Sequence, residues 1–489
     1  MHKYNNETPF IHLLRSRRGY YFYDVNMNEI VNVSGETYNY LSSLEKKEGQ
    51  YSTLVSPSVD AEVNCLVNKG YLKTNRPRII EMPGMQNLEY SLSNKLKFLI
   101  LQVTQKCNFR CKYCHFSTDE EGYHEHNYAS MDWETARKAI DFFAERTRDQ
   151  RNISIVFYGG EPLLELELLY KCIEYCNRKF FGKKLNYFLT TNAELLTIEN
   201  AKFLLENNVS ITVSIDGPKE IHDKNRKRAG DGSGTFDKIY DNLRRIKCAL
   251  PNHYKKIKFN CVIDPASDCK CIDEFFSSNM FKDSYVATNL MSPADTKKLY
   301  LSKEYIKNEK KSKLLFLLAR ANIYRESQIT TTARNFFDNF YMFESRFDTL
   351  GKIPNTSGHA GPCKPGVNKL FVSVSGKFYI CEKARDDSNA LCIGSLEYGF
   401  DIQKIKEICS YMCRDRCKNC WNIHNCNVCQ MMLDDGEKLS DELFDIACEN
   451  SCRIAEENFK KLVAVSEFSE IIHAKECQEK HAESSSIPL

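Results

Sequence analysis

The stretch QVTQKCNFRCKYCHF, residues 102–116, carries three cysteines in the pattern C-x3-C-x2-C. It directly follows KFLILQV, an apolar run ending at Val103 that predicts a buried strand. Three thiolates at this spacing can bind one face of a four-iron cluster and leave the fourth iron open. A zinc loop is the alternative, and it needs a fourth protein ligand, for which His115 is the adjacent candidate. The three cysteines are Cys107, Cys111 and Cys114.

Strand-like runs alternate with helical patterns from about residue 96 to residue 290. This alternation predicts parallel βαβ units. Six such units predict an α/β fold built as an open, partial (β/α)6 barrel, in which active sites lie at the carboxyl ends of the strands. The expected strands are KFLILQV, then residues 152–158, 185–191, 209–216, 256–264 and 284–288.

The composition of the 489 residues narrows the class of protein. The net charge of +3 argues against a protein that coats nucleic acid, and no uncharged apolar run is long enough to span a membrane. The first residues lack the apolar core of a signal peptide, so we expect a cytoplasmic protein. Eleven of the 22 cysteines lie between Cys363 and Cys452. In a long chain without a secretory signal, this density indicates metal or redox chemistry.

With Tyr113 as the aromatic residue, the motif C-x3-C-x-aromatic-C resembles the signature of radical S-adenosylmethionine (SAM) enzymes. The resemblance implies that the open iron chelates SAM. One electron then cleaves SAM to a 5′-deoxyadenosyl radical, which abstracts a hydrogen atom from the substrate. The resemblance also implies an electron donor such as flavodoxin or ferredoxin.

Further residues fit the same family. Gly159-Gly160-Glu161-Pro162 follows the second strand and resembles the family's GGEP motif, in which Glu161 could accept from the methionine ammonium of SAM. Polar residues at the ends of the third and fourth strands would bind the ribose and carboxylate of SAM. Each of these could instead be a strand-end cap or form a surface ion pair. They are Asn192, Ser214 and Arg226.

The C-terminal cysteines resemble a SPASM domain, which holds auxiliary iron–sulfur clusters. The resemblance implies that Cys363, Cys381 and Cys429 bind auxiliary cluster I, and that Cys417, Cys420, Cys426 and Cys448 bind auxiliary cluster II. Lys369 stands where the family usually has another cysteine, which suggests an open iron in cluster I. Because the gap before Cys429 is one residue shorter than usual, other cysteines could substitute, namely Cys392, Cys409, Cys413 and Cys452. A zinc-ribbon-like domain is the alternative.

Five other cysteines fall inside helix or strand patterns. We expect them to be core thiols without a ligand role. They are Cys65, Cys172, Cys176, Cys248 and Cys261.

The first 85 residues predict three short strands and helices. This layout resembles the RiPP recognition element, a PqqD-like winged helix that binds leader peptides. The leader would add a strand beside Glu29–Val33, with side-chain pockets from the helix near residues 60–70. A DNA-binding winged helix is the alternative. The expected division of the chain is 1–85, the barrel 86–290, a helical bridge 291–355, the SPASM domain 356–460 and a tail 461–489 that could be disordered.

The whole layout resembles the maturases of sactipeptides and ranthipeptides. The resemblance implies an enzyme that binds the leader of a ribosomally made, Cys-rich peptide and forms thioether crosslinks from cysteine sulfur to carbon. The acceptor residue and the α, β or γ carbon stay open. The alternatives are a formylglycine-forming or carbon–carbon crosslinking SPASM enzyme, and a non-catalytic peptide-binding iron–sulfur scaffold.

Overall fold

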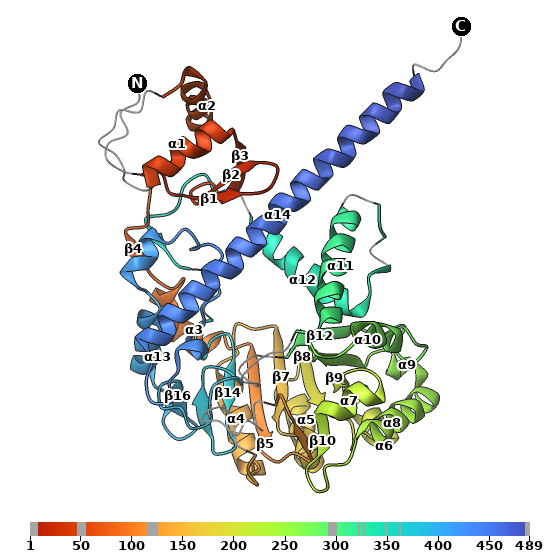
Figure 1. Cartoon of the computed structure of the whole chain (residues 1–489). Helices are drawn as coiled ribbons and strands as arrows, with labels where there is room; N and C mark the ends of the chain where they lie inside the picture. The colour runs from red at the N-terminus through yellow and green to blue at the C-terminus, as the bar shows by residue number, and fades with distance from the viewer. Residues whose placement is uncertain are drawn as a thin grey trace.

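The computed structural model describes residues 8–45, 55–114, 126–291, 301–320, 323–325, 328–347, 350–359, 361 and 363–484, with the backbone alone for 335 and 472–484. The barrel region lies at one end of the molecule and the N-terminal module at the other (Figure 1). The long helix α14 (Asp441–Ser484) runs diagonally between them.

Six parallel strands form the barrel part of one large sheet. Their order in the sheet is β12-β11-β9-β8-β7-β5, so each strand lies beside the barrel strand that precedes or follows it in the chain. All six predicted strands are confirmed, within two residues at each end. They are β5 (Phe98–Thr104), β7 (Asn152–Gly159), β8 (Lys184–Thr191), β9 (Val209–Ser214), β11 (Lys258–Ile263) and β12 (Val286–Leu290).

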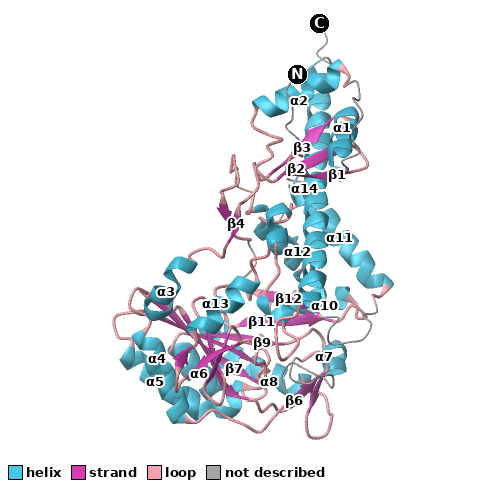
Figure 2. Ribbon diagram, turned by 90° about the vertical axis from the view of Figure 1, so that its left-hand side faces the viewer, coloured by secondary structure: helices cyan, strands magenta, loops and turns pink. Residues whose placement is uncertain are grey.

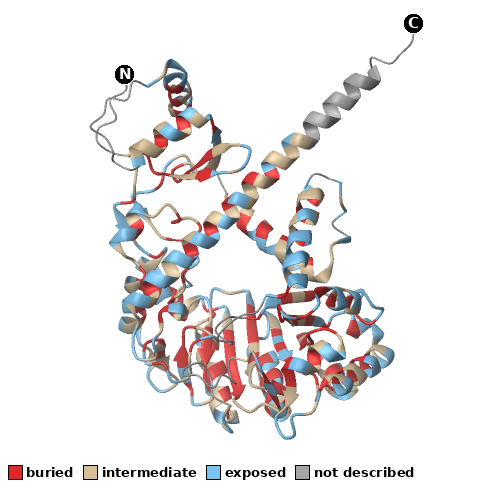
Figure 3. Ribbon diagram, viewed as in Figure 1, coloured by how far each residue is buried: buried red, intermediate tan, exposed pale blue. Residues whose placement is uncertain are grey.

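Amphipathic helices cover the outer face of this sheet (Figure 2). In α4 the buried residues Ala136, Ala139, Ile140 and Phe143 recur at helical spacing, and Asp132 caps the helix by accepting from the Thr135 amide at 2.7 Å. Burial is concentrated where these helices meet the strands (Figure 3). The helices of this region are α3 (Leu88–Asn94), α4 (Trp133–Glu145), α5 (Leu166–Lys179), α6 (Ile198–Glu206), α7 (Lys219–Asn225), α8 (Phe236–Ala249), α9 (Pro251–Tyr254) and α10 (Cys269–Phe276).

The cysteine-rich segment continues the same sheet. Strand β14 (Leu370–Val372) pairs in parallel with β5, and three antiparallel strands follow it. Gly376, with φ +79°, makes the turn between β14 and the next strand. The sheet thus crosses the boundary that the sequence places between the barrel and the SPASM region. The three strands are β15 (Lys377–Tyr379), β16 (Cys392–Ser395) and β17 (Gly399–Phe400), followed by α13 (Ile402–Tyr411).

The N-terminal module has a three-stranded antiparallel sheet in the order β1-β2-β3. Ser34 caps α1 by accepting from the Thr37 amide at 3.1 Å. Strand β3 lies at one edge of the sheet and β1 at the other. The elements are β1 (Ile11–Arg15), β2 (Tyr20–Asp24), β3 (Glu29–Val33), α1 (Gly35–Glu45) and α2 (Pro57–Asn68).

A second hydrophobic core joins the N-terminal module to the rest of the chain. Tyr23 of β2 packs on Phe459 of α14, with ring centroids 4.6 Å apart. His12 of β1 stacks on Trp421, with centroids 3.8 Å apart and planes at 9°. Phe343, from the helical bridge, joins the same core. The bridge consists of α11 (Lys303–Arg320) and α12 (Thr331–Glu344), as the sequence predicts.

The expectation of a separate tail after residue 460 is wrong within the described residues. Helix α14 continues to Ser484 because one of its faces carries Phe459 and Val463 into the shared core, while ion pairs such as Arg453–Glu457 line its exposed side. In the part of the chain that the structure describes, no helix is both long and apolar enough to cross a membrane.

Candidate active site

The three-cysteine loop lies at the carboxyl end of β5. Cys107 follows β5, Cys111 ends the short strand β6 (Phe109–Cys111), and Cys114 lies three residues further on. Burial raises the pKa of Cys111 to about 12, and the neighbouring Cys114 raises it further while Arg226 lowers it. Burial also raises the pKa of Cys107, and Cys111 and Cys114 add to that shift. The three thiols therefore lie close enough to interact and need a cation to ionise near neutral pH.

A buried ion pair between Arg226 and Asp216 supports this loop. Strand β6 pairs with β10 (Arg226–Arg228), so that Arg226 lies opposite Cys111. The Arg226 guanidinium donates to both oxygens of Asp216, at 2.9 and 3.1 Å, and lies over the Tyr113 ring at 5.3 Å. The Tyr113 hydroxyl also donates to Asp216. Arg226 thus positions the cysteine loop through Asp216 and Tyr113, and its expected contact with SAM stays a prediction.

The two glycines after β7 pack against the loop's backbone. A Cβ on Gly159 would lie 2.0 Å from the Thr104 carbonyl oxygen, and one on Gly160 would lie 2.1 Å from that of Lys106. The Gly160 amide donates to the Thr104 carbonyl at 3.0 Å. Because neither glycine has a side chain, both can closely approach the start of the cysteine loop.

Glu161 is buried and accepts three hydrogen bonds. Its Oε1 accepts from the Leu163 amide at 3.0 Å and from the Thr191 hydroxyl at 2.7 Å, and its Oε2 accepts from the Asn192 amide at 2.7 Å. Burial nevertheless raises the pKa of Glu161 to about 7. Glu161 therefore joins the ends of β7 and β8, and it can change its charge state near neutral pH.

Asn192 and Ser214 lie at the strand ends where the sequence places them. The Asn192 side chain donates to the Asn108 side-chain oxygen at 2.8 Å, and Asn108 donates to Glu194 at 2.5 Å. This chain of amides ties the residue after Cys107 to the end of β8. Ser214 ends β9 and is buried. The SAM contacts of Asn192 and Ser214 stay predictions.

The structure brings the four expected cysteines of auxiliary cluster II together. Burial raises the pKa of Cys448 to about 11, Arg416 lowers it, and three neighbouring thiols raise it further. These neighbours are Cys426, Cys417 and Cys420. Cys452, one turn after Cys448 on α14, joins the group and accepts a hydrogen bond from the Cys420 thiol. Five thiols thus share one location, and the choice of four ligands among them stays a prediction.

The cysteines expected at auxiliary cluster I also meet. Burial raises the pKa of Cys381 and of Cys429; Cys429 adds to the first shift and Cys363 to the second. Lys369, in the place of the usual further cysteine, forms an ion pair of 2.8 Å with Glu382, the residue after Cys381. The Lys369 amine cannot serve as a thiolate ligand, so it adds nothing to the three expected cysteines of this group.

Among the described residues, no three side chains of His, Cys, Asp and Glu are arranged to hold a single metal ion. His115, the fourth ligand of the zinc alternative at the first motif, lies outside the described residues, so that alternative stays untested. The arrangement fits a larger, thiolate-bound group. This fit rests on the three interacting thiols, of which Cys111 is buried. Asp216, Tyr113 and the two glycines hold the loop that carries them.

The sequence missed several residues that join the barrel to the cysteine-rich segment. The Oδ2 atom of Asp386 accepts from the side-chain amides of Gln102 at 2.8 Å and of Gln105 at 2.9 Å. The only local signal was a polar Gln102 at the end of an apolar strand. Two of the expected core thiols, Cys65 and Cys248, are exposed, because they lie on the outer faces of their helices; Cys172, Cys176 and Cys261 are buried.

Comparison with known proteins shows what the region around this site is similar to. Residues 101–269 match the Radical SAM superfamily. The chain is 32% identical over 196 residues to the cysteine-type anaerobic sulfatase-maturating enzyme of Clostridium perfringens, covering 38% of this chain and 50% of that protein. It is 26% identical over 249 residues to the radical SAM cyclopropyl synthase TigE of Paramaledivibacter caminithermalis, covering 47% and 51% respectively.

The chain spans about half the length of the curated relatives it matches. Among solved structures, native anSMEcpe with bound AdoMet and Cp18Cys peptide has a similar fold, with a TM-score of 0.53 and 21% identity over 76% of this chain and 99% of that one. The matched residues 101–269 contain the three-cysteine loop, Glu161 and Arg226. Residues 101–269 are therefore similar to radical SAM domains, whose cofactors are SAM and a 4Fe–4S cluster.

Proposed function

We propose that this protein is a radical SAM maturase that modifies a ribosomally made, Cys-rich peptide and forms thioether crosslinks. The observation that carries the proposal is the combination, in one chain, of the radical SAM loop with two further groups of thiols built from the C-terminal segment. The similarity to a cysteine-type sulfatase-maturating enzyme supports action on a cysteine.

The N-terminal module is the proposed docking site for the leader peptide. Strand β3 lies at the sheet edge away from β1, which packs on α14, so a peptide strand can pair with β3. Helix α2 packs on this sheet through Val59, Val63 and Leu66 and can supply side-chain pockets beside the edge. Docking there would raise the local concentration of the core peptide at the barrel.

Different residues of the chain have different roles in the proposed reaction. When bound, the 4Fe–4S cluster and SAM supply the radical that removes a hydrogen atom from substrate carbon. Asp216, Arg226 and Tyr113 hold the cysteine loop, and Gly159 and Gly160 let it pack on β7. The three thiols Cys363, Cys381 and Cys429, with Lys369 in the usual place of another cysteine, leave room for a substrate sulfur at auxiliary cluster I.

A formylglycine-forming activity is the second candidate. It is favoured by the 32% and 31% identity to sulfatase-maturating enzymes over 38% and 31% of this chain. The two reactions give different products. Thioether formation removes one hydrogen from a thiol and one from a carbon and joins the two atoms. Formylglycine formation instead converts the cysteine side chain to an aldehyde.

The test is an anaerobic reaction of the iron-loaded protein with SAM, a chemical reductant and the precursor peptide. We expect 5′-deoxyadenosine and a peptide that lacks two hydrogens and one free thiol for each crosslink, measured by mass spectrometry with thiol alkylation. An aldehyde product would select the second candidate. A protein that binds peptide but never cleaves SAM would be a scaffold.

Leader docking is tested separately by hydrogen exchange. Addition of precursor peptide should slow exchange of the β3 amides, residues 29–33, because they gain hydrogen-bond acceptors. The β1 amides serve as the internal control, because that strand faces α14. Equal protection of both strands, or of neither, would contradict docking on β3.

A further inference from the structure

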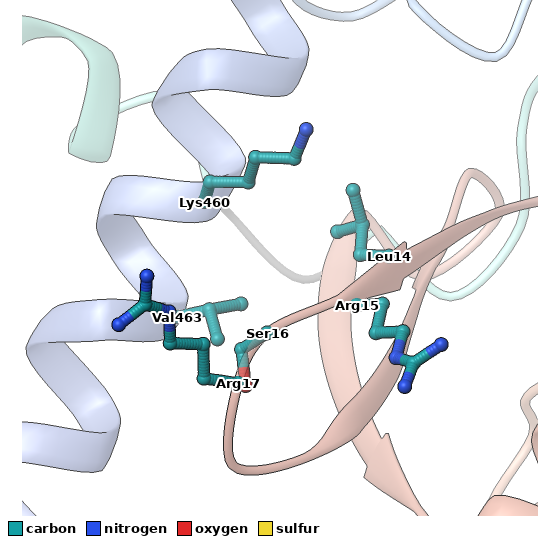
Figure 4. Close-up of a pocket in the computed structure, with 6 residues that line it drawn as sticks. All are labelled: Leu14, Arg15, Ser16, Arg17, Lys460 and Val463. Atoms are coloured by element: carbon teal, nitrogen blue, oxygen red, sulfur yellow. The ribbon is translucent and has the colours of Figure 1, made fainter.

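A cavity of about 450 Å³ lies between the N-terminal module and α14 (Figure 4). It opens beside the turn that joins β1 to β2, far from the cysteine loops in sequence. None of the proposed chemistry uses its residues. They are Leu14, Arg15, Ser16, Arg17, Lys460 and Val463.

The cavity combines aliphatic walls with positive charge. Leu14 and Val463 are buried members of the core that joins the module to α14. Arg17 extends from the turn toward α14, and Lys460 projects from α14 on the other side (Figure 4). Arg15 turns its guanidinium away, over the ring of Tyr20 at 5.2 Å. A ligand would therefore meet Arg17 beside an apolar wall, with Lys460 on the α14 side.

The nearby carboxylates already have partners. Glu456 pairs with Lys460 at 2.6 Å, one turn away on the same helix. Glu467 accepts from the hydroxyls of Ser16 and Tyr21. Arg17 and the adjacent Arg18, in contrast, form no ion pair with any carboxylate in the described residues. The turn thus presents cations that the protein itself leaves uncompensated.

We propose that this cavity binds an acidic side chain, next to an aliphatic one, of the same peptide that pairs with β3. The proposal rests on the proposed function and names a second recognition point for that peptide. The occupant follows from charge complementarity, because Arg17, which has no ion-pair partner in the described residues, can attract a carboxylate, and an aliphatic neighbour fits against Leu14 and Val463.

The register of the module's sheet brings the two recognition points within reach. Arg15 pairs with Tyr20, and Tyr20 pairs with Val33, so the cavity and the end of β3 lie at the same end of the sheet. A peptide strand paired with β3 lies three strand spacings of about 4.8 Å from β1. About four to five extended residues, at roughly 3.3 Å each, cover that distance. A peptide leaving β3 at Val33 can therefore place an acidic residue in the cavity.

The test measures binding by the full chain with a fluorescent synthetic peptide of alternating Glu and Leu. The matched control peptide carries Gln in place of Glu. We expect Arg17→Glu to weaken binding of the Glu peptide at least about tenfold, and Arg17→Gln to weaken it less, since the attraction is electrostatic. Arg18→Glu is the control variant, because Arg18 lies on the same turn outside the cavity lining, and it should change binding less than about threefold.

Charge exchange makes the test specific. The Arg17→Glu protein should regain affinity for a peptide with Lys in place of Glu. Equal effects of Arg17→Glu and Arg18→Glu, or equal binding of the Glu and Gln peptides, would overturn the proposal. So would a single-stranded oligonucleotide that binds with the same dependence on Arg17. Circular dichroism should show unchanged folding of each variant, because the Arg17 side chain forms no ion pair.

The outcome is separable from that of the proposed function. Arg17-dependent binding by a protein that modifies no peptide would leave the cavity assignment standing and remove the maturase proposal. If the Arg17→Glu protein forms thioethers normally on full-length precursor and keeps its peptide affinity, the cavity assignment is wrong and the maturase proposal stands.

Discussion

Glu161 is the residue whose charge state the structure makes sensitive to pH. Its pKa of about 7 lies above its ordinary value of 4.5, so the fold favours its protonated form. That contribution to stability is complete below about pH 4.5 and is lost as the pH rises through 7. The melting temperature of the unmodified protein should therefore fall between these pH values, and we expect a smaller fall in the Glu161→Gln variant. A melting curve against pH that is identical in both proteins would contradict the assignment.

The same residue gives a prediction for SAM binding. If Glu161 accepts from the methionine ammonium, bound SAM favours the carboxylate, so affinity should rise as the pH increases toward 7. Glu161→Gln should weaken binding roughly ten- to hundred-fold, because a charge-assisted hydrogen bond is lost, and should flatten this pH dependence. Equilibrium binding of SAM to the iron-loaded protein checks both. Unchanged affinity would restrict Glu161 to its role of joining β7 to β8.

Asp216 should matter more than Tyr113 for the stability of the cysteine loop. Asp216→Ala leaves the Arg226 guanidinium buried without its partner, which typically costs about 3–5 kcal/mol. Tyr113→Phe removes one hydrogen bond of about 1 kcal/mol and keeps the ring under Arg226. Urea denaturation of both variants, with their iron content after reconstitution, measures the difference. Equal losses would show that the ion pair does not position the loop.

At the scale of elements, the packing of β7 on the cysteine loop predicts a large effect of one methyl group. Gly160→Ala would place a Cβ 2.1 Å from the Lys106 carbonyl oxygen, so the loop must move away. We expect the barrel to fold but to lose about four of roughly twelve iron atoms, those bound by Cys107, Cys111 and Cys114. The triple variant of these cysteines to Ala should lose the same share.

The matched control is Gly230→Ala, because nothing lies within 4 Å of a Cβ at that glycine. It should keep its full iron content and its melting temperature. If Gly160→Ala also keeps all of its iron, the glycine is not needed for the approach of β7 to the loop.

At the scale of the whole molecule, the N-terminal module and the auxiliary cluster II cysteines form one packed unit. Trp421 follows Cys420 and stacks on His12, while His424 bonds to the Val25 carbonyl at 3.0 Å. Leader docking and cluster integrity are therefore not separable by truncation, although the sequence suggests two independent domains. This makes a simple deletion of the module a poor test of leader recognition.

Deletion of residues 1–85 should expose Trp421, Phe459 and Val463 to water. We expect the truncated protein to lose roughly four iron atoms, from auxiliary cluster II, while the cluster of the three-cysteine loop stays bound. Trp421→Ala in the full chain should show part of the same loss. Iron analysis and limited proteolysis between residues 417 and 426 measure it. Full retention of iron in both proteins would show that the shared core does not support that loop.

The sequence by itself determined the six barrel strands, the capped helices and the identity of the cysteine motif. These features depend on local periodicity and on spacings of a few residues, which do not change with the tertiary contacts of the segment. It also indicated which thiols to expect at the two auxiliary groups, since that followed from a family pattern, and the choice of ligands among them stays a prediction.

Only the tertiary structure decided what those residues contact. The sequence did not indicate that Arg226 pairs with Asp216, or that Gly160 approaches the backbone of Lys106. The extension of the sheet through β14, the stacking of His12 on Trp421 and the length of α14 join segments far apart in the chain. Such contacts depend on which faces folding brings together, and no local pattern encodes that choice.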